Sequence, residues 1–287
     1  MERIMTRIYP NIVPENNLRL PDALTIKHGP ARLLATFVLE GDKAAREIGV
    51  RLRLRHDFGE LVYVNKHAAV RRSWQPLLDI FNPEYSDLLP ENSYWISGED
   101  EHGEIVLTQA GRVYYWPDTT LEQEANLMFY GGRDKGQRTV VTAADAKLMT
   151  GVVFYGGSGW VRPDFRGKRL MRLVPRLGRA YALARWPVDW GISFVVPKLV
   201  DNGVTAGYGY KHTSYSIYFP GSVVGDVDVV LVSISASEAY ADFAETLDRL
   251  GHSGHSASAA STSISFLDDR LTKISSDRVF QGSNSRS

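Results

Sequence analysis

A glycine-interrupted β run that leads into a basic turn and a long amphipathic helix constrains this fold more than any other stretch. The run over 150–161 reads TGVVFYGGSGWV, with strand-forming residues on both sides of its glycines. Glycines inside a strand pattern predict a bulge or a strand that diverges from its neighbour. A turn, RPDFRGKR, follows, and the strongest helical periodicity of the chain comes next. The sequence therefore predicts a strand, a turn and a helix over 150–185.

The predicted helix has two different faces. One is an apolar stripe made of Leu170, Leu173, Val174, Leu177, Tyr181 and Ala184, and the other is an arginine stripe made of Arg169, Arg172, Arg176 and Arg179. We expect the first face to pack in the core and the second to form a basic surface. Pro175 should kink the helix or confine its regular part to the C-terminal side, because an interior proline is unfavourable by about 3 kcal/mol.

The remaining patterns alternate between strand and helix signals. A helix is expected over 32–48, a hairpin over 93–116, a helix over 119–130, strands over 50–54, 189–196, 208–219 and 226–235, and a closing helix over 236–250. This order predicts a mixed α/β (α+β) sheet with flanking helices. We divide the chain into an N-terminal arm and helix (1–48), a main domain (49–250) and a Ser-rich linker with a short flexible tail (251–287).

Composition excludes several kinds of protein. The chain has 287 residues, 44% of them apolar, which suffices for a sizeable core. Its 33 basic and 33 acidic residues cancel, so no overall charge attracts it to nucleic acid or to a membrane. The absence of cysteine excludes disulfides and thiolate chemistry. Neither a membrane span nor a metal-ligand spacing of histidines is visible, and we expect a cytoplasmic protein without a metal.

The predicted order of elements over about 49–247 resembles the GNAT (N-acyltransferase) superfamily, with the stretches VRPDFRGKRL, DWGISFVV and AGYGYKH at the corresponding places. The resemblance implies that the diverging strand receives the pantetheine arm of acetyl-CoA or another acyl-CoA, and that the turn binds its pyrophosphate. The cofactor-binding residues it implies are Gly159, Trp160, Val161, Arg166, Gly167, Lys168, Arg169 and Leu170. A helix start with orphan N–H groups suits this role.

The turn departs from the family pattern. Arg166 and Gly167 are present, but Arg169 and Met171 stand where the family has small residues. These side chains would crowd the pyrophosphate, or Arg169 would instead donate a charge-assisted hydrogen bond to a phosphate oxygen. A diverged fold that no longer binds the cofactor is the alternative to an acyl-CoA site.

The reaction implied by the resemblance is direct transfer of an acyl group to an amine. A backbone N–H near Gly159 to Val161 would bind the oxyanion, and Tyr208, or alternatively Tyr210, would protonate the thiolate. The run over 150–161 contains no carboxylate. A water chain, or a carboxylate elsewhere such as Glu104 or Asp189, would have to serve as the base, although a solvated turn carboxylate and a strand-entry residue are the simpler explanations of these two.

Two other functions remain open at this stage. The stripe from Arg169 to Arg179, with aromatic residues nearby, would suit nucleic acid, although the neutral overall charge argues against it. A non-catalytic binding module that uses the tail over 251–287 is the other alternative. If the protein is an enzyme, its acceptor is a small-molecule or protein amine, held by the regions 67–89 and 129–138 that the resemblance points to.

Overall fold

The computed structural model describes residues 17–70, 74–130, 138–223 and 225–251. The chain divides into two compact units, Met1–Ala244 and Glu245–Ser287. In the second unit, residues 245–251 are described and are helical. Most of the predicted linker and tail, the first sixteen residues of the predicted arm and the loop over 131–137 therefore lie outside the described residues.

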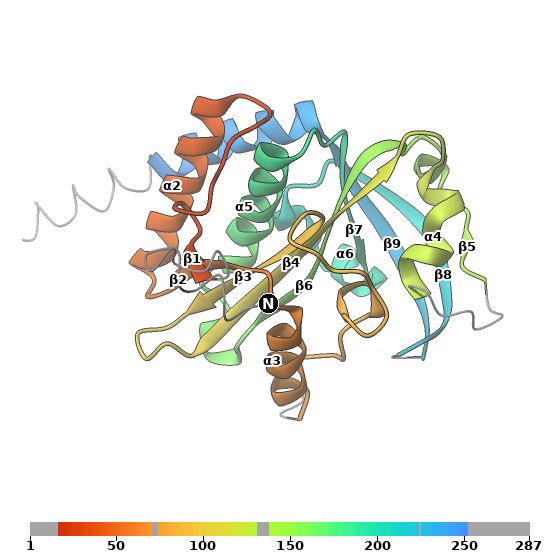
Figure 1. The fold of residues 1–287 in the computed structure, drawn as a ribbon, viewed down its shortest axis with the longest axis horizontal. Helices are drawn as coiled ribbons and strands as arrows, with labels where there is room; N and C mark the ends of the chain where they lie inside the picture. Colours follow the sequence, from red (N-terminus) through yellow and green to blue (C-terminus); the bar gives the residue numbers. More distant parts are fainter. Residues whose placement is uncertain (1–16, 71–73, 131–137, 224, 252–287) are drawn as a thin grey trace, which may run out of the picture. The chain divides into compact units, whose positions relative to one another are not determined.

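The first unit is built on a mixed sheet (Figure 1). Within the described residues, the strand order is β1-β2-β3-β4-β6-β7-β9-β8-β5, and β6 and β7 pair in parallel. The strands are β1 (Leu18–Arg19), β2 (Arg51–Arg55), β3 (Ser93–Glu99), β4 (Ile105–Trp116), β5 (Val140–Val141), β6 (Gly151–Val161), β7 (Trp190–Val195), β8 (His212–Ser222) and β9 (Gly225–Ser235). The helices are α2 (Ala31–Glu47), α3 (Phe58–Val70), α4 (Leu121–Tyr130), α5 (Leu170–Arg185) and α6 (Pro197–Asp201), joined by short 3₁₀ turns that include η2 (Asp79–Phe81) and η5 (Thr205–Tyr208). Residues 236–244 are also helical.

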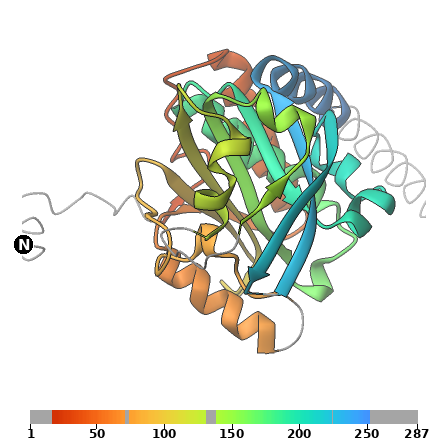
Figure 2. The same cartoon turned by 90° about the vertical axis from the view of Figure 1, so that its right-hand side faces the viewer.

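Alternation along β3 places neighbouring side chains on opposite faces of the sheet. Tyr94 faces α5, where its hydroxyl donates to the carbonyl of Gly178 at 2.5 Å, and α2 packs against α5 on this side. Trp95 belongs to the core cluster on the other face, together with Phe58 of α3. Figure 2 shows α3 on the side of the sheet away from α2. Helices therefore cover both faces, as the sequence pattern predicts.

The predicted elements occur in the expected order, including the 93–116 hairpin and the helix over 32–48, but the strand expected over 208–219 begins only at His212, because Tyr208 ends η5. The expectation that Pro175 would confine the regular helix to its C-terminal side is wrong, because α5 continues through Pro175 as one helix. Pro175 lacks the N–H that would bond the carbonyl of Met171, one turn earlier, and its ring crowds that carbonyl, but burial of the ring offsets part of this cost. Across the described residues, no helix is both long and apolar enough to span a bilayer.

Candidate functional site

The parallel strands β6 and β7 pair only at one end. Their register covers Val153 to Tyr155 of β6, and the last pair is Tyr155 with Ile192. Beyond it β6 continues to Val161 while paired with β4 on its other side. We call the point where β6 and β7 separate, at Tyr155 and Ile192, the fork. The strand predicted to diverge therefore does so, directly at its glycines.

A bulge in β6 follows the fork. Trp160 pairs with Thr108 of β4 and Gly157 pairs with Ala110, so two residues of β6 lie opposite one residue of β4. One of the two, Ser158, has a positive φ of 50°. A bulge of this kind turns the strand and changes the faces to which its side chains point. The glycine interruption in the sequence is thus the signal of both the bulge and the fork.

A cavity of about 310 Å³, which we call the fork cavity, opens between the two strands. Gly156 to Gly159 of β6, Ser193 to Val195 of β7 and the following Val196 line it. Further lining comes from both faces of the sheet: Trp74, Gln75, Pro76, Leu77, Leu78 and Phe81 on the α3 side, and Met171, Pro175, Leu199, Tyr208 and Tyr210 on the α5 side, and Gln109 of β4 and Tyr155 of β6 complete it. Ligands that approach from opposite faces of the sheet can therefore meet at the fork.

A second cavity, of about 410 Å³, lies at the start of α5 and shares Met171 and Tyr208 with the fork cavity. We call it the arginine pocket, because Arg166, Arg169 and Arg172 line it together with Gly167 and Leu170. No carboxylate stands among its described lining residues. Arg169 itself adopts the left-handed conformation just before the helix and makes no side-chain cap. Three guanidinium groups beside a helix N-terminus favour a multiply charged anion.

Three features identify the fold: the strand order, the diverging parallel pair, and the helix that starts after the diverging strand. The chain has a GNAT-like fold. The fold class expected from the sequence, a mixed sheet with a diverging strand and flanking helices, is thereby confirmed.

No family model and no curated protein matches this sequence. Solved structures of several acetyltransferases do match it. AAC(6')-Ib, an aminoglycoside acetyltransferase in complex with coenzyme A and kanamycin, is 16% identical, with a TM-score of 0.37 over 66% of this chain and 96% of its own. NAA60 of Arabidopsis thaliana, in complex with acetyl-CoA, is 10% identical, with a TM-score of 0.41 over 66% and 99% of the two chains. RimJ of Mycobacterium smegmatis is 12% identical, with a TM-score of 0.38 over 68% and 89%. At this level the likeness concerns the fold alone.

The GNAT-like domain brings most of the sequence-predicted cofactor residues to these two cavities. Gly159 lines the fork cavity, and Val161 and the 166–170 turn line the arginine pocket, except for Lys168. The ammonium of Lys168 lies over the ring of Phe165, 4.1 Å from its centroid. Trp160 also points elsewhere, because the bulge turns its buried side chain away from both cavities. Its ring stacks on that of Trp74 with centroids 5.4 Å apart.

Both candidate tyrosines of the GNAT-like domain line the fork cavity. Tyr208 also lines the arginine pocket, and the Tyr210 hydroxyl donates to the carbonyl of Ile192 at 3.3 Å, directly at the fork. Burial raises the pKa of Tyr208, and the neighbouring Tyr210 raises it further. Burial also raises the pKa of Tyr210, whereas the charge of Arg179 lowers it. Both side chains therefore carry their protons at neutral pH and can act as proton donors.

The arginine stripe is not one basic surface. Arg169 and Arg172 line the arginine pocket, but Arg176 and Arg179 are only 6% and 1% exposed. The expectation of a continuous basic face is wrong for these two, because they donate to backbone carbonyls of the 207–209 turn, and Arg176 also pairs with Asp242. Reasoning from the sequence missed Asp242, because nothing marks a partner 66 residues away from Arg176.

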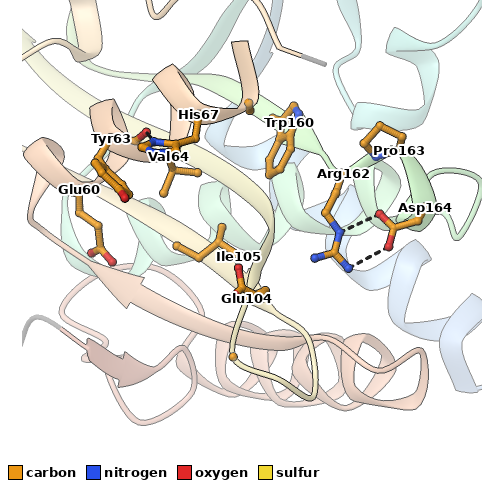
Figure 3. Close-up of a pocket in the computed structure, with 12 residues that line it drawn as sticks. Glu60, Tyr63, Val64, His67, Glu104, Ile105, Trp160, Arg162, Pro163 and Asp164 are labelled. Carbon is orange, nitrogen blue, oxygen red and sulfur yellow. Dashed lines mark hydrogen bonds and ion pairs between the residues drawn. The ribbon is translucent and has the colours of Figure 1, made fainter. Parts of the chain in front are cut away.

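A third cavity, of about 760 Å³, lies between α3 and the segment over 160–164 (Figure 3). Glu104 and Trp160 line it, and Arg162 and Asp164 pair at its edge. Glu104 therefore faces a different cavity from the fork. Asp189 accepts the N–H of Val152 at 2.8 Å, before the paired part of β6 and away from the fork. Neither of the two candidate bases lines the fork cavity.

Proposed function

We propose that this protein is an acyl-CoA-dependent N-acyltransferase that moves an acyl group, most simply acetyl, to an amine by direct attack. The observation that carries the proposal is the arginine pocket, which adjoins a cavity lined from both faces of the sheet at the fork. In this arrangement the phosphates of the cofactor bind beside Arg166, Arg169 and Arg172. The pantetheine arm then extends past Met171 and Tyr208 into the fork cavity.

The sequence left open whether Arg169 crowds the pyrophosphate or donates a hydrogen bond to it. The surroundings of Arg169 support the second interpretation. Arg169 is exposed and Gly167 has a positive φ of 80°, with open space where a Cβ would stand. The Arg169 side chain lines the pocket without filling it, since about 410 Å³ remains. We therefore assign Arg169 to phosphate binding by a charge-assisted hydrogen bond.

The acceptor amine enters from the α3 side, where Trp74 to Phe81 line the fork cavity within the expected acceptor region over 67–89. A backbone N–H of β6 near Gly159 binds the oxyanion, and Tyr208 protonates the departing thiolate, with Tyr210 as the alternative donor. We assign no general base. Whether the acceptor is a small molecule or a protein, and the cytoplasmic location, remain predictions from the sequence.

Isothermal titration of the purified protein with acetyl-CoA and with free CoA tests this proposal. We expect micromolar binding by the wild type and at least a tenfold loss in Arg169→Glu, since the substitution turns an attractive charge beside the phosphates into a repulsive one. Arg32→Glu is the matched control, because Arg32 is exposed on α2 and far along the chain from the pocket. Equal loss in both variants, or no binding at millimolar CoA, contradicts the proposal and favours a non-catalytic binding module.

A further inference from the structure

A buried arginine lies directly beneath the tyrosine segment of the candidate site. Arg179 of α5 is 1% exposed. Its guanidinium donates to the carbonyl of Tyr208 at 2.8 Å and to that of Gly209 at 3.1 Å. The same guanidinium carbon lies 4.3 Å from the centroid of the Tyr210 ring. One side chain therefore contacts all three residues from Tyr208 to Tyr210.

Two glycines make room for this arrangement. A Cβ at Gly191 of β7 would lie 3.2 Å from Cδ of Arg179. Gly209 has a φ of +77°, and a Cβ there would lie 2.6 Å from Oδ2 of Asp242 and 2.7 Å from Cζ of Arg176. Glycine accepts both the conformation and the close approach. The middle residue of the YGY stretch is thus fixed by the buried charges below it.

The buried charges do not cancel. We call Arg176, Arg179 and Asp242 the arginine cluster. The two oxygens of Asp242 accept from Nε and Nη2 of Arg176, at 2.7 and 3.0 Å, so this pair is bidentate. Arg179 donates to two backbone carbonyls and pairs with no carboxylate of its own, and its Nε is buried without a partner within the described residues. The cluster therefore holds two guanidinium groups against one carboxylate.

A buried charge without a direct partner is unfavourable for folding. Such charges concentrate at functional sites, where they stabilise charge that appears during a reaction. The excess positive charge of the arginine cluster lies under Tyr208 and Tyr210, which line the fork cavity. We propose that Arg179 is a positioning residue for acyl transfer, which holds the tyrosine segment and stabilises the negative charge formed when the thioester breaks. This inference rests on the proposed function.

In acyl transfer to a neutral amine, the amine nitrogen bonds to the carbonyl carbon, the carbon-sulfur bond breaks, and sulfur leaves with the electron pair. A tyrosine hydroxyl gives its proton to sulfur, which yields the CoA thiol and a tyrosinate. The proton that the acylated nitrogen releases then returns to the tyrosinate. Arg179 stabilises the tyrosinate, because its guanidinium lies against the Tyr210 ring in a water-poor environment, and through the tyrosine it favours departure of the thiolate.

The titratable groups near Tyr210 are Arg179 of α5, Tyr208 of η5, Tyr155 of β6 and Tyr94 of β3, and Ser193 of β7 also forms a hydrogen bond with it. Arg176 and Asp242 face Arg179 in turn. Among these groups, Arg179 is the one that brings a positive charge to Tyr210 directly. Replacement of its charge should therefore change the acidity of groups at the fork while the three arginines of the phosphate site stay in place.

The test measures the pKa of the CoA thiol bound to the protein, followed by the ultraviolet absorbance of the thiolate, so that no acceptor is needed. We expect the wild type to bind CoA with a thiol pKa below that of free CoA. Arg179→Met should bind CoA with similar affinity but raise that pKa by about 1 or more. Arg179→Lys should restore most of the difference, since it keeps the charge. Arg32→Met on α2 is the control that should change nothing.

Tyrosine variants separate a specific effect from a general loss of structure. If Arg179 acts through the tyrosines, its replacement should have a smaller effect on the thiol pKa in Tyr208→Phe or Tyr210→Phe than in the wild type. The inference is overturned if replacement of Arg179 changes the thiol pKa as much in both tyrosine variants as in the wild type. It is also overturned if the wild type, Arg179→Lys and Arg179→Met have equal thiol pKa values. Failure of the wild type to bind CoA is a distinct outcome that overturns the proposed function, and this inference with it.

Discussion

Replacement of Asp242 by Asn should lower the free energy of unfolding strongly, because it leaves the buried guanidinium of Arg176 without its carboxylate. Asp242 and Arg176 have side chains only 3% and 7% exposed, and two hydrogen bonds join them. Asparagine has nearly the same size, so the change removes charge and one acceptor and leaves the packing almost unaltered. The perturbation is therefore largely electrostatic.

Removing one partner of a buried ion pair destabilises proteins by about 3–5 kcal/mol. Here Arg179 lies next to the pair and adds a second positive charge, so we expect the upper half of that range. For a unit of this size, each kcal/mol lowers the midpoint of thermal unfolding by roughly 2–4 °C. Chemical denaturation followed by circular dichroism should show a lower midpoint with an unchanged m-value.

Glu40→Gln is the matched control. Glu40 pairs with Lys43 on α2, and the two side chains are 47% and 63% exposed. Such surface pairs contribute about 0–1 kcal/mol. The double variant Arg176→Met with Asp242→Leu should recover most of the loss, since it removes both charges together. A loss in Asp242→Asn no larger than that in Glu40→Gln would refute the reasoning, and so would a double variant less stable than Asp242→Asn.

Three further predictions follow from the same contacts. Gly209→Ala should lower the free energy of unfolding by about 1–3 kcal/mol in urea, because φ is +77° and the new Cβ would meet Asp242. Glu104→Gln should keep kcat within about twofold for any amine that the wild type acetylates, because Glu104 faces a cavity other than the fork; a hundredfold loss would make it the base. If Tyr208 is the proton donor, kcat should show no alkaline decline up to pH about 9.5, since burial raises its pKa above the ordinary value of 10.0 and the protonated form is the active one. A decline centred near pH 8 would indicate a different acid.

The sequence predicts the element order well, because strand and helix periodicities are local properties. The diverging strand is the clearest example. Glycines at 156, 157 and 159 interrupt a run of strand-forming residues, and β6 separates from β7 directly after Tyr155. The direction in which the side chains point beyond that place is not local. A bulge opposite Gln109 sends Trp160 into another cavity, and no periodicity in β6 shows the shift.

The candidate site could be predicted in part for the same reason. The turn over 166–170 is a single stretch of sequence, and it lines one pocket apart from Lys168. The side chains of the 74–81 segment and of Gln109 reach the fork only through tertiary folding. A stripe of arginines on a helix predicts a solvated face, but the 207–209 turn and Asp242 cover two of its four members. Their burial depends on contacts far apart in the sequence.

The two buried arginines, Arg176 and Arg179, need different explanations. Apolar residues of similar volume often replace a buried ion pair without loss of stability, so Arg176 and Asp242 need no functional explanation. Arg179 differs, because it has no carboxylate of its own and an apolar side chain would avoid burying its charge. Its two carbonyl contacts would equally be satisfied by a neutral donor, whereas its contact with the Tyr210 ring depends on the charge. Arg179→Lys keeps that charge and loses the guanidinium geometry, whereas Arg179→Met loses both. The difference between these two variants at the bound thiol therefore measures what the charge does at the fork.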